Sequence, residues 1–97
     1  AGSILADFLE KSEEELQAGV EAIEKKDWAQ AKSIFHKMAG SSFTVRAEDL
    51  AQREREVEHY VQEEEIVETV LSEKLDRVTE ALKQVKKIFE KTDWESL

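Results

Sequence analysis

The chain has 97 residues, which suits one domain with a modest core and is too short for a multidomain enzyme. Hydrophobic residues make up 40% and charged residues 38%, and three glycines with no proline favour long helices over sheets. The net charge of −9 repels nucleic acid and anionic membranes, the lack of cysteine excludes disulfides and thiolate metal sites, and no apolar run approaches the roughly 20 residues that cross a bilayer. We therefore expect a cytoplasmic protein that binds no nucleic acid and does not insert into membranes.

The first segment, residues 4–25, has apolar residues at spacings of three and four, which indicates an amphipathic helix. Ser12 followed by Glu15 is typical of a capping box, the side-chain pair that begins many helices. The segment is therefore expected as two helices, about 4–11 and 13–25, unless they are fused.

A second capping-box pair, Asp27 and Gln30, opens the next segment, whose apolar residues share one face. This pattern predicts a helix over about 28–42 that ends at a polar, turn-prone break from Ser41 to Thr44. The large side chains here are interpreted as core residues or loop anchors rather than as a ligand cage: Trp28, Phe35, Met38 and Phe43.

Two further amphipathic helices are predicted over about 46–61 and 65–91. The last carries a heptad seam: Leu71, Leu75, Val78, Leu82, Val85 and Phe89. Helices of this length with short connections predict an all-α domain, an antiparallel up-and-down four-helix bundle, with a short extra N-terminal helix if residues 4–11 are separate. The competing arrangement is a self-associating coiled coil built on the last helix, because a heptad seam suits either geometry.

His36 is the strongest candidate for chemistry, because the chain has no P-loop, no dinucleotide fingerprint and no H-E-x-x-H motif. At about 100° per residue it lies roughly 130° from the centre of the apolar face, so its imidazole is expected in solvent. Three small residues share its sector and leave the ring unshielded: Ala29, Ser33 and Gly40. Glycine inside a helix costs about 1 kcal/mol relative to alanine, so Gly40 indicates close approach by another molecule.

Positive charge gathers around the same histidine. Residues 25–46 hold Lys25, Lys26, Lys32, Lys37 and Arg46 against Asp27 alone. Cations near an exposed imidazole would stabilise a phosphoryl group or attract an acidic partner. A neutral imidazole is also a competent nucleophile near pH 7.

His59 has no comparable surroundings. It lies among Glu54, Glu56, Glu58 and Glu63 and is interpreted as ordinary surface. A zinc site formed by His36 and His59 would need carboxylates from different helices to converge, and none is expected.

The stretch His36-Lys37-Met38-Ala39-Gly40-Ser41-Ser42 resembles the His-x-Leu-Lys-Gly-Ser/Ala-Ser/Ala motif of histidine-containing phosphotransfer (HPt) domains, the relay modules of multistep two-component signalling. Phe8-Leu9, the Asp27-Trp28 helix start and residues 47–51 also resemble that family. The resemblance implies a four-helix bundle with His36 as phosphoacceptor, Gly40 as the glycine that opens access and Met38 as a buried position. Ala39 departs from the family, which usually has a lysine there to steady the phosphoryl group.

The function implied by the resemblance is that of a phosphorelay intermediate. His36 would accept a phosphoryl group from a receiver-domain aspartate of a response regulator or hybrid sensor kinase and pass it to another receiver. The residues expected to contact phosphate or partner are Lys32, Lys37, Gly40, Ser33 and Ala29.

Such a domain is a phosphocarrier without ATP-dependent kinase activity of its own, whether it acts alone or as part of a hybrid histidine kinase. It needs no cofactor, with Mg²⁺ expected only on the partner receiver, and it is expected to be a monomer. The alternative is a helical protein-interaction module, either a degenerate HPt-like domain or a coiled-coil partner, which binds through the Leu71–Phe89 seam without phosphotransfer.

Overall fold

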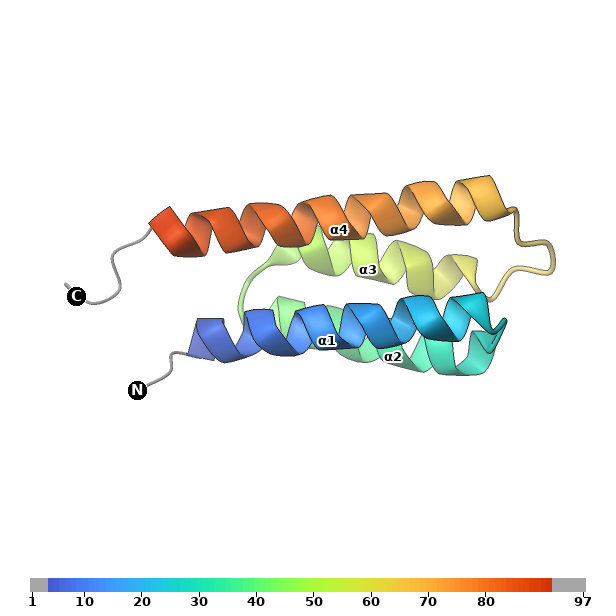
Figure 1. The fold of residues 1–97 in the computed structure, drawn as a ribbon, viewed down its shortest axis with the longest axis horizontal. Helices are drawn as coiled ribbons and strands as arrows, with labels where there is room; N and C mark the ends of the chain where they lie inside the picture. The colour runs from blue at the N-terminus through green and yellow to red at the C-terminus, as the bar shows by residue number, and fades with distance from the viewer. Residues whose placement is uncertain (1–3, 92–97) are drawn as a thin grey trace.

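The computed structural model describes residues 4–91, which form four helices joined by short connections (Figure 1). The helices are α1 (Ile4–Glu24), α2 (Trp28–Thr44), α3 (Glu48–Tyr60) and α4 (Glu68–Lys91). Consecutive helices run in opposite directions, and this part of the chain contains no strand. The predicted all-α antiparallel bundle is confirmed.

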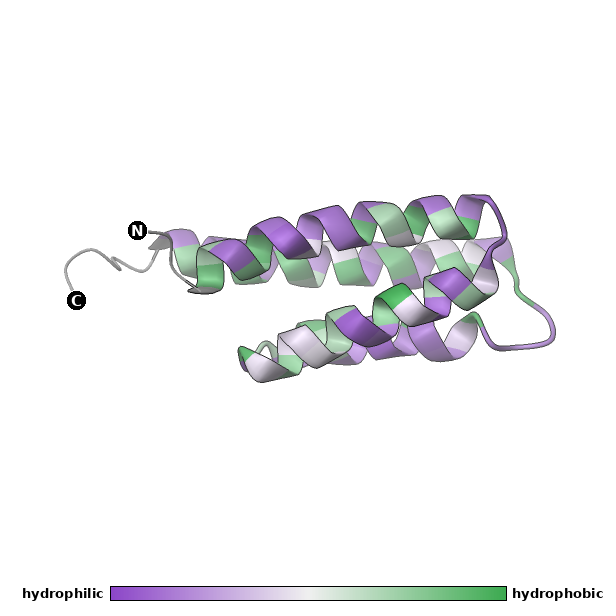
Figure 2. Cartoon of the chain, turned by 90° about the horizontal axis from the view of Figure 1, so that it is seen from below, coloured by the Kyte–Doolittle hydropathy of each residue, from purple (hydrophilic) through white to green (hydrophobic). Residues whose placement is uncertain are grey.

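The helices pack mainly against their neighbours in sequence. Packing is most extensive between α2 and α3, then between α1 and α2 and between α3 and α4, whereas α1 and α4 barely touch. Figure 2 shows hydrophobic positions recurring among hydrophilic ones along each helix. The largest fully buried apolar side chains are Phe35, Met38, Leu50, Val57 and Val78. Each contributes on the order of 1.5–3 kcal/mol by leaving water, so together they stabilise the packing of α2, α3 and α4.

The heptad seam of α4 faces the interior of this bundle. Leu71, Val78 and Leu82 are at most 6% exposed. Leu75, Val85 and Phe89 are half-buried, so the seam packs within the domain as the bundle arrangement predicts.

The two expected helices of the first segment, 4–11 and 13–25, are fused, because α1 is one continuous helix from Ile4 to Glu24. Ser12 is 3% exposed and lies in the same buried stripe as Phe8 and Leu9. The inward-facing stripe continues across the serine, so packing against the bundle keeps the helix intact where a capping signal predicted a break.

The predicted end of α2 is two residues too early. The helix continues through the Ser41–Thr44 stretch and ends at Thr44. Ser42 is fully buried, and the Thr44 hydroxyl donates to the Gly40 carbonyl one turn back, so both polar side chains are compatible with helix. The turn beyond has Arg46 at φ 66° and an Ala47 N–H to Ser42 carbonyl bond of 2.8 Å, a Schellman-type ending.

The start of α2 agrees with the sequence. The Asp27 side chain accepts a hydrogen bond from the Gln30 backbone N–H at 3.3 Å, as the capping pair predicts. The last two helices are slightly shorter than expected and begin at Glu48 and Glu68. Between them the Val67 N–H donates to the Tyr60 hydroxyl at 2.9 Å, which ties the connection to the end of α3.

Candidate functional site

His36 lies midway along α2 with its side chain 74% exposed. Its neighbours Phe35 and Met38 are 0% and 1% exposed. Because these two side chains are locked in the core, the rotation of α2 about its axis leaves the imidazole in solvent. The expectation that His36 reaches solvent is confirmed.

Glu58 of α3 contacts one side of the imidazole. Its Oε2 lies 3.0 Å from Nδ1 of His36, and its side chain is only 11% exposed. A carboxylate oxygen accepts hydrogen bonds, so this contact is a hydrogen bond in the tautomer that carries the ring proton on Nδ1. In that neutral tautomer the lone pair is on Nε2, the ring nitrogen that does not bond Glu58.

The sequence interpretation missed Glu58. Its signal was present, because Glu54 and Glu58 fall in the same three-and-four spacing as Leu50, Val57 and Val61, all of which are buried. Glu54 and Glu58 are 0% and 8% exposed, although their charge suggested surface. His59, beside them, is exposed on α3 as expected.

Glu54 forms a second polar contact across the α2–α3 interface. The Ser42 hydroxyl donates to its Oε1 at 2.6 Å, while its Oε2 is buried without a hydrogen-bond partner among the described residues. Burial raises the pKa of Glu54 to about 7, the hydrogen bond from Ser42 opposes this, and the charge of Glu15 adds to it. A titratable carboxyl group thus lies in the core one helical turn from Glu58.

The small residues predicted around His36 occupy the expected surface. Ala29, Ser33 and Gly40 are all exposed on α2. A Cβ added at Gly40 would meet no atom within 4 Å, so packing inside the domain does not explain this glycine. At Gly19 of α1 the same Cβ would lie 2.7 Å from the Phe35 ring, which shows that the close approach of helices occurs there instead.

The basic residues are more dispersed than a ring around His36. Lys32 and Lys37 are exposed on α2, one turn before His36 and directly after it. The others lie away from it in the chain: Lys25 and Lys26 in the α1–α2 turn, and Arg46 in the α2–α3 turn. Ala39 is 3% exposed, so this position faces packed neighbours and does not offer an open place for a lysine.

The aromatic residues divide into three environments. Phe35 is core, as predicted. Trp28 is half-buried at the edge of the core. Phe43 is 41% exposed, so its interpretation as a core or loop anchor is wrong. It follows His36 by seven residues, about two helical turns, and therefore lies on the same face of α2.

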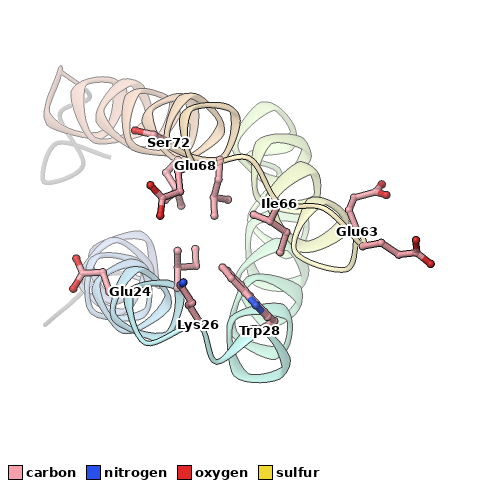
Figure 3. A pocket seen from close by; sticks show the side chains of 11 residues that line it. Glu24, Lys26, Trp28, Glu63, Ile66, Glu68 and Ser72 are labelled. Atoms are coloured by element: carbon pink, nitrogen blue, oxygen red, sulfur yellow. The ribbon is translucent and has the colours of Figure 1, made fainter.

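A cavity of about 700 Å³ lies away from His36, between the helix ends that adjoin the α1–α2 and α3–α4 connections. Figure 3 shows Trp28 and Ile66 directed into the space between the helices, whereas Glu63 points away from it. The residues that line the cavity include the apolar Ile23, Leu71 and Leu75 but not His36. His36 therefore lies on an open surface outside this cavity.

Among the described residues, no three or more histidine, aspartate or glutamate side chains lie together in a way that could hold a metal ion. Within residues 4–91, none of the helices combines the length and apolar character required to cross a membrane.

Comparison with known proteins gives one match. A family model described as Hpt domain matches residues 3–88. No curated protein and no solved structure matches the chain.

Proposed function

We propose, because the chain belongs to the Hpt domain family, that it is a phosphorelay intermediate in which His36 carries the phosphoryl group. Hpt domains are phosphotransfer modules of two-component signalling that carry phosphoryl groups rather than act as kinases. In this proposal His36 receives the group from a receiver-domain aspartate and passes it to another receiver. The observation that carries the assignment is the exposed imidazole of His36, whose Nδ1 contacts the Glu58 carboxylate.

The transfer is a single displacement at phosphorus. The Nε2 lone pair of neutral His36 attacks the aspartyl phosphate, the N–P bond forms, the P–O bond to the aspartate breaks, and the aspartate leaves as a carboxylate. The ring becomes a phosphorylated imidazolium that keeps its Nδ1 proton. Glu58, at 3.0 Å from that nitrogen, stabilises the new positive charge, and no proton needs to leave the site. The reverse transfer follows the same path.

The surroundings of His36 supply positioning and charge. Ala29, Ser33 and Gly40 leave room for the partner, while Lys32 and Lys37 offset the negative charge of the phosphoryl group. This chain needs no cofactor for the step, because Mg²⁺ belongs to the receiver. We propose that the domain acts as a monomer in the cytoplasm.

The test uses two phosphodonors. The chain is incubated with phosphoramidate and, separately, with a radiolabelled receiver domain phosphorylated on its aspartate, and acid-labile, base-stable label on the chain is measured. We expect the parent and His59→Gln proteins to be labelled and the His36→Gln protein to remain unlabelled, with equal helical content in all three. Label retained in His36→Gln, or an absence of label in the parent with both donors, would refute the proposal.

A further inference from the structure

Phe43 and Arg55 form an exposed pair beside the phosphotransfer face. The Arg55 guanidinium carbon lies 6.0 Å from the centre of the Phe43 ring, within the range of a cation–π contact. Phe43 is 41% exposed, and Arg55 is exposed on α3. Neither side chain is therefore buried in the core of the domain.

The pair lies on the same side of the α2–α3 interface as the reactive histidine. On α2, Phe43 follows His36 by two turns, about 10.5 Å along the axis. On α3, Arg55 precedes Glu58 by three residues, so the two share a helix face. Glu58 bonds His36 and Arg55 covers Phe43, so two contacts cross the interface along one edge.

Arg55 retains its capacity to bind a carboxylate. Its helix neighbour Arg53 pairs with Asp49 and Glu56 on α3. Within the described part of the chain, Arg55 pairs with no acidic side chain and rests on the Phe43 ring instead. Contact with a ring face uses none of the guanidinium N–H donors, so the exposed Arg55 keeps them for a partner.

No side chain projects from α2 at Gly40, between His36 and Phe43. Gly40 lies between them and has no atom within 4 Å of the place where a Cβ would stand. A partner that reaches Nε2 of His36 can therefore lie along α2 as far as Phe43. Aromatic and arginine side chains are the types that dominate binding energy at protein interfaces.

We propose that Phe43 and Arg55 are the anchor by which this domain captures a receiver, with Phe43 filling an apolar depression and Arg55 pairing with a carboxylate on the receiver's docking face. This inference rests on the proposed function. The anchor takes no part in the chemistry. Its loss should weaken the transfer complex and leave the rate within the complex intact.

The experiment is single-turnover transfer from a radiolabelled phosphorylated receiver that labels the parent, measured against increasing concentration of the domain. We expect Phe43→Ser to raise the half-saturating concentration about 10-fold and Arg55→Gln about 5-fold, with limiting rates within two-fold of the parent. Val70→Ser is the matched control, because Val70 is exposed on α4, which packs mainly against α3. It should change neither quantity.

Phosphoramidate separates the failure of this inference from that of the proposed function, because a small donor needs no anchor. Phe43→Ser should be labelled by it as fast as the parent. Unchanged half-saturation in both variants would overturn the anchor while leaving His36 as phosphoacceptor. Slower phosphoramidate labelling of Phe43→Ser would also overturn the anchor, because it would mean that Phe43 affects the reactivity of His36 itself. A parent dimer that Phe43→Ser converts to monomer would assign the face to a second copy, and an unlabelled parent would remove both proposals.

Discussion

Nδ1 of His36 and Oε2 of Glu58 lie 3.0 Å apart across the α2–α3 interface, where the imidazole is 74% exposed and the carboxylate side chain 11%. The contact joins the exposed imidazole to a carboxylate that is largely buried between two packed helices. Rotation of the ring is therefore restrained from its inner side, while its outer nitrogen stays accessible. This arrangement combines an exposed imidazole with a restrained ring orientation.

Glu58→Ala should slow phosphotransfer to His36 by roughly 10- to 100-fold, because a hydrogen bond to a charged group is worth about 1.5–3 kcal/mol. Glu58→Gln, which keeps an acceptor without the charge, should recover part of the rate. The tautomer is the independent measurement: ¹⁵N chemical shifts of the ring should show Nδ1–H in the parent and lose that preference in Glu58→Ala.

Glu56 provides the matched control for Glu58, because it lies on the same helix and binds Arg53 rather than His36. Glu56→Gln should leave both transfer and the tautomer unchanged. A parent-like rate and tautomer in Glu58→Ala would show that the Glu58 contact does not orient the ring.

Replacing both Lys32 and Lys37 with alanine should lower the transfer rate about 10-fold at low salt, with a smaller deficit as salt screens the charges. The physical reason is that two exposed cations close to His36 interact with the phosphoryl group most strongly inside the transfer complex. Lys83 and Lys87 of α4 are exposed, and their double alanine variant changes the net charge equally. If both double variants transfer at equal rates at every salt concentration, the lysines beside His36 are ordinary surface.

Gly40 and Gly19 should respond to substitution in opposite ways. Gly40→Gln places a side chain in open space beside His36, so it should slow transfer from a receiver while stability rises by up to about 1 kcal/mol. Gly19→Ala pushes a methyl group against the buried Phe35 ring and should reduce the free energy of unfolding by about 1–3 kcal/mol. Urea denaturation measures both changes in the free energy of unfolding. If Gly19→Ala were as stable as the parent and Gly40→Gln less stable, the surroundings described for the two glycines would be contradicted.

Stability should fall as the pH rises toward neutrality because of Glu54. Its pKa is raised to about 7 in the folded protein from an ordinary value of 4.5, so the folded state binds more protons between these two pH values. The stabilising contribution of the protonated group is fully present below about pH 4.5 and is lost as the pH passes 7. The expected loss is on the order of 3 kcal/mol.

Glu54→Gln isolates this effect from the other carboxylates, since Gln keeps an acceptor for the Ser42 hydroxyl and does not ionise. Urea denaturation of both proteins from pH 5 to 8 should give similar stabilities at pH 5 and a more stable variant at pH 8. A difference between the two proteins that does not change with pH would mean that Glu54 titrates normally.

Local periodicity predicted much of the site. The burial of Phe35 and Met38 and the exposure of His36 follow from the 3.6-residue repeat of one helix, which is a property of neighbouring residues alone. The motif around His36 indicated the family, and the family model supports it. The helix ends were less accurate, because the buried Ser12 and Ser42 are tolerated within helices that packing holds together.

Contacts between helices required the tertiary structure. His36 and Glu58 are 22 residues apart, and their contact depends on how far α2 and α3 slide and rotate against each other. Glu54 and Glu58 lay in an apolar register, yet a glutamate is ordinarily a surface residue, and only a donor from another helix makes its burial favourable. The sequence alone thus determined which residues each helix turns inward or outward, a consequence of local backbone geometry. The pairing of His36 with a buried carboxylate was decided by the packing of α2 on α3, because a contact between helices has no periodicity within either one.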